Sequence, residues 1–170
     1  DSNLDNMGID VSKLEKHIDL NCKIKYGKLY NKNSGRHISA IIPVHVFGMA
    51  ADIKKIIHLG NKYNLKIVED AAEALGSFWE NKHLGTFGKI GTLSFNGNKI
   101  ITTGGGGALL TNDDELAKKI RHISSTAKIS HEWEYIHDEV GWNYRMPELC
   151  CAVALAQLEN IDDLVEKRIK

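Results

Sequence analysis

The chain has 170 residues and a mass of 19.0 kDa, enough for one domain with a hydrophobic core and too few for two ordinary domains. Its 22 Lys and Arg residues balance 22 Asp and Glu residues, which excludes a strongly basic protein that attracts nucleic acid or an acidic membrane by its overall charge. Three cysteines make no disulfide framework, the longest apolar run is too short to cross a bilayer and no secretion signal opens the sequence, so we expect a cytoplasmic protein.

The first predicted elements are a helix, a strand and a second helix. IDVSKLEKHI (9–18) predicts a helix that Asp10 can cap. SAIIPV (39–44) predicts a buried strand that ends at its proline, and ADIKKIIHLGNKYN (51–64) predicts a helix with Asp52 near its start. The apolar positions expected on the two helices are Val11, Leu14, Ile18, Ile53, Ile56 and Ile57.

Strand-like runs dominate the middle of the chain. LKIV (65–68) predicts a short buried strand that leads directly into Glu69 and Asp70. LGSFW (75–79) and GTLSF (91–95) predict further strands. The turns expected between them are ENKH (80–83) and GTFGKIG (85–91).

The remaining predicted elements are one strand and two helices. GALLT (107–111) predicts a strand, and NDDELAKKIRHI (112–123) predicts a helix capped by Asn112 or Asp113. Pro147 suits the first turn of a final helix, because its missing N–H is not needed there. The apolar positions expected on these two helices are Leu116, Ile120, Ile123, Leu149, Val153 and Ala156.

The order of these segments predicts the fold class. Residues 124–142 lack clean periodicity and are expected to form a long excursion, while the other segments alternate between strand and helix. Such alternation predicts an α/β fold with a largely parallel sheet, and ligands of these folds bind beyond the C-terminal ends of the strands. Asp70 and Ser94 fall at or near predicted strand ends, as does the loop that holds Lys99, so we expect a site at this edge.

Four consecutive glycines, Gly104–Gly107, raise the possibility of a phosphate-binding loop. A dinucleotide fingerprint needs glycine at its first, third and sixth positions, but starts at Gly104 and Gly105 place Leu109 and Leu110 at the sixth. A Walker loop needs lysine followed by serine or threonine, and the chain has Ala108 there; the run also leads into a strand instead of a helix. We interpret the glycines as allowing unusual backbone angles and close approach.

Three motifs, taken together and in this order, resemble a known family. They are VEDAAEALGS (68–77), GTFGKIGTLSFNGNKIITTGGGG (85–107) and GWNYRMPEL (141–149). The chain resembles the DegT/DnrJ/EryC1/StrS family of sugar aminotransferases, which use pyridoxal 5'-phosphate on the fold-type I aminotransferase scaffold. The resemblance implies a three-layer sandwich with a mostly parallel central sheet, in which residues 1–170 form part of the cofactor-binding large domain. Family members also carry an N-terminal segment and a small C-terminal domain, and we expect both to lie outside residues 1–170.

Pyridoxal phosphate chemistry needs a reactive amine, a carboxylate facing the ring nitrogen and a polar group for the phosphate. By resemblance, Lys99 forms the Schiff base and later carries a proton between substrate and cofactor, and Asp70 pairs with the pyridinium nitrogen. Ser94 matches a phosphate ligand, and Ala72 matches a small residue under the ring. Glu73 stands near the phenolic oxygen, where many family members carry glutamine.

The resemblance also implies an intact enzyme that is a homodimer. Asn143 matches an asparagine that each subunit donates to the phosphate in its partner's site. Arg145 can meet a substrate phosphate or carboxylate, or form a structural salt bridge. Trp133 and Trp142 can line a sugar pocket or pack in the core. Lys89 replaces an aspartate common in the family, which we interpret as a surface change.

Each candidate also has a purely structural interpretation. A single lysine is usually a solvated surface charge, so Lys99 without its flanking motifs does not indicate a reactive amine. Asp70 can simply cap the segment that begins at Ala71. Ser94 on a strand is more often a hydrogen-bonding neighbour, and Asn143 in a loop usually bonds backbone. The cysteines and histidines show no metal-ligand spacing, so no metal site is expected.

The predicted function is transfer of an amino group from L-glutamate, which leaves as 2-oxoglutarate, to a nucleotide-linked keto-deoxysugar for surface polysaccharide biosynthesis. One alternative is the dehydratase branch of the family, but that branch typically has histidine in place of Lys99. A second alternative is a truncated, non-catalytic homologue. Because parts of the family's substrate cleft are missing, we expect the 170-residue chain alone to be poorly active.

Overall fold

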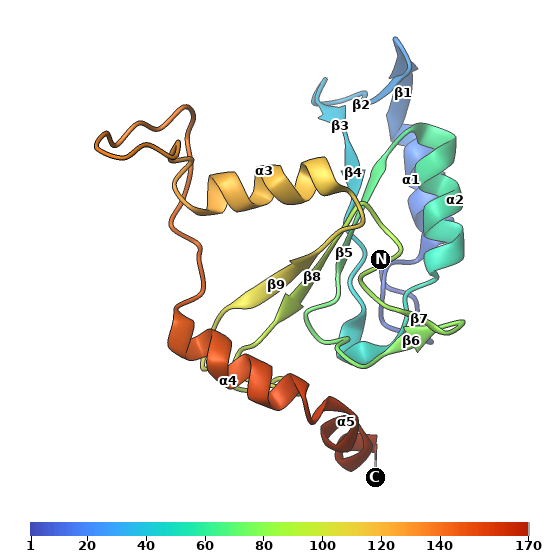
Figure 1. Ribbon diagram of the computed structural model, residues 1–170. Coiled ribbons are helices and arrows are strands. Elements are labelled where there is room, and N and C mark those ends of the chain that lie inside the picture. Colours follow the sequence, from blue (N-terminus) through green and yellow to red (C-terminus); the bar gives the residue numbers. More distant parts are fainter. Residues whose placement is uncertain (170) are drawn as a thin grey trace.

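The computed structural model describes residues 1–169, and at its centre lies a four-stranded mixed sheet (Figure 1). The strands lie in the order β4-β5-β8-β9; the first three are parallel, and β9 is antiparallel to β8. Their bounds are Ala40–Ile41 (β4), Lys66–Asp70 (β5), Ile90–Ser94 (β8) and Gly107–Leu110 (β9). The predicted α/β fold with a mostly parallel central sheet is therefore confirmed.

Three helices flank this sheet, and each begins after an aspartate. Asp10, Asp52 and Asp113 each accept a hydrogen bond from the backbone N–H three residues later, at 3.0, 3.3 and 2.9 Å. These carboxylates satisfy amides that the first turn of a helix leaves unpaired, as the sequence predicted. Figure 1 shows α1 and α2 on one side of the sheet and α3 on the other, which gives three layers. The helices are α1 (Val11–Asn21), α2 (Ile53–Tyr63) and α3 (Asp114–Ser124).

The main hydrophobic core lies between α2, α1 and the parallel strands. Ile53 and Ile56 of α2 are fully buried and belong to one cluster with Ile41 of β4 and Ile67 of β5. Each fully buried aliphatic side chain of this size stabilises the fold by about 2 kcal/mol relative to an exposed one. Ile57 lies half-buried at the edge of the cluster, so the predicted apolar face of α2 is confirmed.

A second, smaller cluster lies next to the C-terminal end of β5. Ala71, Ala74 and Leu84 are all fully buried there. Phe87 packs against this cluster and also against the main core. The small cluster therefore supports the chain that directly follows Asp70, where the sequence predicts a site.

The strand predicted at LGSFW (75–79) is confirmed only for its last two residues, and it does not join the central sheet. Only β6 (Phe78–Trp79) is extended, and it pairs with β7 (Lys82–His83) as a separate two-stranded hairpin. The two residues between them have positive φ angles, 47° at Glu80 and 63° at Asn81. Two such residues in sequence close a tight hairpin whose twist matches its strands. The turn predicted at ENKH is thus shorter than expected, and it reverses the chain before a sheet strand can form.

A three-stranded antiparallel sheet near the N-terminus was not predicted. Its strands follow one another in the order β1-β2-β3. The first turn contains Tyr26 and Gly27, both with positive φ, 52° and 70°. The strands are short, and β1 exposes three of its four residues, so the sequence carries little of the apolar alternation that marks a strand. Their bounds are Cys22–Lys25 (β1), Lys28–Asn31 (β2) and His37–Ile38 (β3).

The C-terminal part consists of a long excursion and two helices. Between α3 and α4 (Glu148–Leu158) the described chain forms only isolated β-bridges, as expected for residues 124–142. Pro147 directly precedes α4, as predicted. The apolar residues expected on this helix are exposed, with Leu149 78% and Val153 42% accessible. The last described helix is α5 (Ile161–Ile169), and Lys170 lies outside the described residues.

Among residues 1–169, no helix combines the length and the apolar character that a membrane span requires.

Candidate active site

Asp70 occupies the C-terminal end of β5, where main-chain bonds hold it on two sides. Its N–H donates to the carbonyl of Pro43 at 2.8 Å, and its carbonyl accepts from the N–H of His45 at 3.0 Å. On the other side Asp70 pairs in register with Thr92 of β8. The backbone position of this carboxylate is therefore fixed by two neighbouring segments of the sheet.

The side chain of Asp70 is half-buried and only partly used by the protein. Its Oδ1 accepts a hydrogen bond from the N–H of Ala72 at 3.1 Å. The capping interpretation is thus partly correct, but the residues from Ala71 to Gly76 form turns and not a helix. Within residues 1–169 the second oxygen, Oδ2, has no hydrogen-bond partner. One acceptor atom remains for a ligand.

Lys99 is tied to the loop that follows Asp70. Its Nζ donates to Oε1 of Glu73 at 3.2 Å, and its side chain is only 17% exposed. The other carboxylate oxygen of Glu73 accepts the N–H of Phe47 at 2.8 Å. The Phe47 N–H and the Lys99 ammonium together hold the pKa of Glu73 below its ordinary value, so this carboxylate is ionised at neutral pH. The interpretation of Lys99 as a solvated surface charge is therefore wrong.

Ser94 ends β8 on the same face of the sheet as Asp70. Asp70 pairs with Thr92, and Ser94 lies two residues beyond Thr92 on the same strand. Side chains two positions apart on a strand point to the same face. The hydroxyl of Ser94 is half-buried and accepts the N–H of Asn96 at 3.4 Å. The predicted neighbour role is thus present, and among residues 1–169 the O–H of Ser94 has no acceptor, so it is available to donate.

The loop that contains Lys99 is held by helix α4. The side-chain amide of Gln157 accepts the N–H of Thr102 at 3.0 Å and donates to the carbonyl of the same residue at 2.7 Å. A reciprocal pair of this kind acts like one rung of a β-ladder and fixes the backbone. Helix α4 therefore positions the loop three residues beyond Lys99.

The glycine run behaves as interpreted from the sequence. Gly104 and Gly106 have φ angles of 80° and 91°, which other residues rarely adopt. A Cβ atom on Gly107 would lie 2.3 Å from the carbonyl oxygen of Leu93, so the close approach of β9 to β8 needs glycine there. The run leads into β9 and not into a helix, which agrees with the rejection of a phosphate loop.

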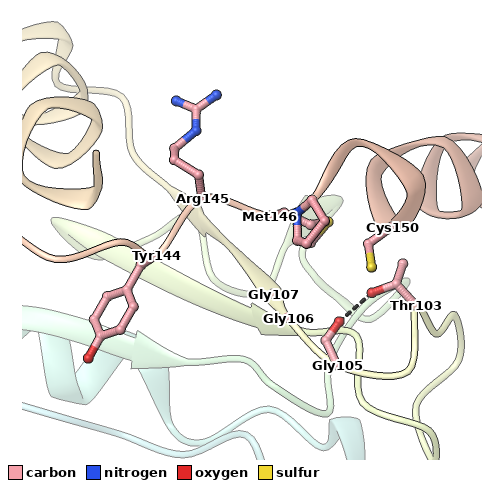
Figure 2. A pocket seen from close by; sticks show the side chains of 9 residues that line it. Thr103, Gly105, Gly106, Gly107, Tyr144, Arg145, Met146 and Cys150 are labelled. Carbon is pink, nitrogen blue, oxygen red and sulfur yellow. Dashed lines mark hydrogen bonds between the residues drawn. The ribbon is translucent and has the colours of Figure 1, made fainter. Parts of the chain in front are cut away.

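A cavity of about 410 Å³ lies beside the glycine run. Figure 2 shows Tyr144 and Arg145 pointing in opposite directions at its border, with Met146 over the glycines. Much of the lining is glycine backbone, and neither Asp70 nor Lys99 lines it. The lining therefore excludes these two residues but includes Gly107, which pairs with Ser94 of β8.

Comparison with known proteins establishes the family. Residues 1–170 match the sequence profile of the DegT/DnrJ/EryC1/StrS aminotransferase family. The chain belongs to this family. It is 43% identical over 129 residues to a GDP-perosamine synthase of Escherichia coli O157:H7, which covers 76% of this chain and 35% of that protein. It is 36% identical over 138 residues to a UDP-4-amino-4,6-dideoxy-N-acetyl-beta-L-altrosamine transaminase of Campylobacter jejuni, which covers 81% of this chain and 36% of the relative.

Solved structures of the family have the same fold. A DegT/DnrJ/EryC1/StrS aminotransferase from Brucella abortus superposes with a TM-score of 0.82 at 32% identity, over 96% of this chain and 41% of that one. Helicobacter pylori PseC, an aminotransferase involved in the biosynthesis of pseudoaminic acid, gives a TM-score of 0.79 at 29% identity, over 95% and 39% of the two chains. The chain thus spans about two fifths of the length of these family structures and little more than a third of the two relatives in sequence.

Two further residues that the resemblance assigns to the cofactor site are Ala72 and Asn143. Ala72 lies in the turn after Asp70, and its N–H binds the Asp70 carboxylate. Asn143 lies in the excursion and forms an isolated bridge with Ser125 at the end of α3. Within residues 1–169 no hydrogen bond joins Asn143 to Asp70 or Lys99. Its role in a partner's site, like that of Ala72 under the ring, stays a prediction.

One buried pair near the family's motif was missed by sequence reasoning. His45 and Glu69 are both fully buried, with 3.0 Å between Nε2 of His45 and Oε2 of Glu69. Glu69 directly precedes Asp70, at a position where the apolar strand LKIV continues into the sheet. The available signal was a carboxylate directly after the predicted buried strand LKIV (65–68), because a charge that is buried needs partners.

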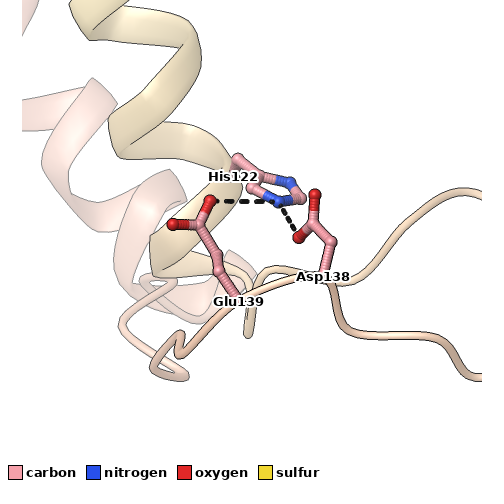
Figure 3. Close-up of side chains that lie close together, drawn as sticks. All are labelled: His122, Asp138 and Glu139. Atoms are coloured by element: carbon pink, nitrogen blue, oxygen red, sulfur yellow. Dashed lines mark hydrogen bonds and ion pairs between the residues drawn. The ribbon is translucent and has the colours of Figure 1, made fainter.

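A second cluster of titratable groups lies on the surface, at the end of α3. Nε2 of His122 lies 2.6 Å from Oδ1 of Asp138 and 3.6 Å from Oε1 of Glu139 (Figure 3). Lys119 also pairs with Glu139. The hydrogen bond from His122 holds the pKa of Asp138 below its ordinary value. Since Lys119 pairs with Glu139 and His122 forms a hydrogen bond with Asp138, we interpret the cluster as a surface network that holds the excursion to α3.

Proposed function

We propose that the whole protein is a pyridoxal 5'-phosphate-dependent aminotransferase, which moves an amino group from L-glutamate to the keto group of a nucleotide-linked deoxysugar. Membership of the family supports the reaction class. The names of two relatives, a GDP-perosamine synthase and a UDP-sugar transaminase, support a nucleotide-sugar substrate and a role in surface glycan biosynthesis. The observation that carries the proposal is the half-buried amine of Lys99, held by Glu73 beside the loop that begins at Asp70.

The groups at this edge of the sheet fit the cofactor chemically. When bound, pyridoxal phosphate supplies an electron-accepting ring to which an amine can be joined. Asp70 has one carboxylate oxygen without a partner among residues 1–169, and we propose that it holds the proton of the ring nitrogen. Ser94 shares the face of Asp70 and can donate its O–H to the phosphate. Ala72, in the turn that follows Asp70, would lie against the ring of the cofactor.

Glu73 has a distinct part in this proposal. Its carboxylate is anchored by the N–H of Phe47 and faces the amine of Lys99. This contact keeps the amine near the position where it must act. We propose that Lys99 takes and returns protons at the reacting carbon, and that Glu73 holds Lys99 between these transfers.

The intact enzyme is proposed to be a cytoplasmic homodimer in which Asn143 reaches the partner's phosphate. The position of Asn143 on an exposed segment, without bonds to Asp70 or Lys99 in the described chain, supports a role outside its own subunit. The three cysteines are free, which fits a reducing compartment. Residues 1–170 would then be part of the cofactor-binding large domain and poorly active alone.

An absorbance experiment on the full-length protein tests this proposal. Addition of pyridoxal phosphate should produce a violet absorbance band that is lost in Lys99→Ala and converted to the pyridoxamine form by L-glutamate. Lys89→Ala is a matched control, because Lys89 is a surface lysine paired with Asp113, and its band should equal that of wild type. If wild type gives no band that depends on Lys99, the proposed function is wrong.

Two alternatives remain distinct outcomes of the same experiment. A dehydratase or a truncated, non-catalytic homologue would leave the band unchanged when L-glutamate is added. The dehydratase is disfavoured by the presence of a lysine at position 99, since the dehydratase branch typically has histidine there.

A further inference from the structure

The fully buried His45 has one possible tautomer in this structure. Its Nδ1 accepts a hydrogen bond from the N–H of Ala51 at 3.2 Å, so this nitrogen carries no proton. The ring proton must therefore lie on Nε2, which donates to Oε2 of Glu69 at 3.0 Å. His45 acts here as a fixed donor that connects the start of α2 to β5.

Glu69 receives three further donors, all from one loop. The N–H groups of Phe87 and Gly88 donate to Oε1 at 2.6 and 2.5 Å, and that of Gly85 donates to Oε2 at 2.8 Å. Burial raises the pKa of Glu69, but the bonds from His45 and from the amides of Gly88 and Gly85 outweigh it, and the pKa lies below its ordinary value. Glu69 is thus a buried, ionised acceptor of four hydrogen bonds.

These bonds hold the chain on both sides of Asp70. The backbone N–H of His45 donates to the carbonyl of Asp70, and the side chain of His45 donates to Glu69, the residue before Asp70. The loop whose amides bind Glu69 packs against Ala71, the residue after Asp70, since a Cβ on Gly85 would lie 3.0 Å from the Cβ of Ala71. The residues before and after Asp70 are therefore fixed independently of any ligand.

We propose that the His45–Glu69 pair is the positioning device for the Asp70 carboxylate. The proposal rests on the proposed function, because it assumes that Asp70 faces the ring nitrogen of pyridoxal phosphate. Successive strand residues point to opposite faces, so Glu69 acts from beneath the sheet while Asp70 faces the ligand side. Glu69 and His45 touch no substrate or cofactor in this scheme; they act through the backbone of Asp70.

The substitution Glu69→Gln tests the proposal with little change in size. All four groups around Glu69 are donors, and an amide presents its NH₂ to two of them. In the full-length protein loaded with pyridoxal phosphate labelled with nitrogen-15 in the ring, NMR reports whether the ring nitrogen is protonated. We expect the Glu69→Gln signal to move toward the neutral form, as in Asp70→Asn, and the cofactor Kd to rise about tenfold.

A second pair of variants covers the case in which Glu69→Gln fails to fold. His45→Leu removes the donor to Glu69 but leaves the three loop amides in place, whereas His45→Gln can restore a donor. We expect His45→Leu to move the ring-nitrogen signal and His45→Gln to return it toward wild type. The control Ile56→Ala removes a fully buried apolar side chain of the main core that donates no hydrogen bond to His45 or Glu69, and it should lower stability without moving the signal.

The outcomes separate this inference from the proposed function. If wild type binds the cofactor through Lys99 but Glu69→Gln and His45→Leu keep the wild-type ring-nitrogen signal, the positioning role is wrong and the function stands. A shift of equal size in Ile56→Ala would also overturn the positioning role, because general loss of stability would then explain it. If wild type shows no cofactor signal, the proposed function fails, and with it the premise of this inference.

Discussion

Lys99 Nζ lies 3.2 Å from Glu73 Oε1, which joins two loops whose residues are 26 positions apart in the sequence. One loop follows β5 and the other follows β8, and these strands are parallel neighbours. Their C-terminal ends therefore meet at one edge of the sheet, where α/β folds bind ligands. This contact unites the two motifs that carry the family resemblance.

The ion pair predicts a pH-dependent stability of the protein without cofactor. The pKa of Glu73 in the folded chain is below its ordinary value of about 4.3. Its contribution is therefore fully present above that ordinary value and is lost as the pH falls through the lower folded value. Glu73→Gln keeps an acceptor for the Phe47 N–H but removes the charge, so the difference in Tm from wild type should be present at neutral pH and vanish in acid.

Thermal unfolding followed by circular dichroism over a pH series measures this difference. Glu115→Gln is a control, because Glu115 is an exposed carboxylate paired with Lys118 and has no contact with the site. A Tm difference for Glu73→Gln that stays constant from neutral to acid pH would contradict the assignment of an ionised Glu73.

Two neighbouring glycines should respond differently to the same substitution. A Cβ on Gly107 would meet the carbonyl oxygen of Leu93 at 2.3 Å, whereas a Cβ on Gly105 has no atom within 4 Å and its φ is not positive. Gly107→Ala must push β9 away from β8, and we expect it to lower the free energy of unfolding by about 2–3 kcal/mol. Gly105→Ala should change it by less than about 0.5 kcal/mol. Urea denaturation measures both, and equal effects would show that the strand spacing is not the constraint.

The local features of this fold and the sheet edge at which a site is expected could be predicted from the sequence pattern, whereas the roles of the individual residues are predicted only through the family resemblance. The aspartate caps of α1, α2 and α3 depend on residues three positions apart, so their signal is local. The Lys99–Glu73 contact depends on which strands are neighbours, which no local pattern contains. LGSFW has the composition of a sheet strand, but the backbone angles at Glu80 and Asn81 end it early.

The His45–Glu69 pair shows why the partners of a buried carboxylate could not be identified from the sequence. Each residue alone has an ordinary interpretation, and 24 positions separate them in the sequence. Only the pairing of β4 and β5 and the return of the loop after β7 bring five polar groups to one buried point. Burial of a charge is evident only once these partners are in place.

Glu69→Gln should strongly destabilise the protein, independently of any cofactor. The amide turns an accepting oxygen into a donor that faces donors in a fully buried place, and we expect a loss of about 3 kcal/mol in the free energy of unfolding at neutral pH. Because the folded pKa of Glu69 is lowered, this contribution is present above the ordinary glutamate pKa and is lost as the pH falls through the folded value. Urea denaturation of wild type and variant at neutral and acid pH checks both the size and the direction.

Mixing two inactive variants of the full-length protein tests the proposed exchange of Asn143 between subunits. Lys99→Ala removes the amine, and Asn143→Ala removes the group proposed to reach the partner's phosphate. A mixed dimer would contain one site with Lys99 from one subunit and Asn143 from the other, so this site should be complete. Random exchange in an equal mixture makes half of the dimers mixed with one active site in two, so about a quarter of wild-type activity should return. If Asn143 acts in its own subunit, the mixed dimers have no complete site and mixing restores nothing beyond the sum of the separate variants.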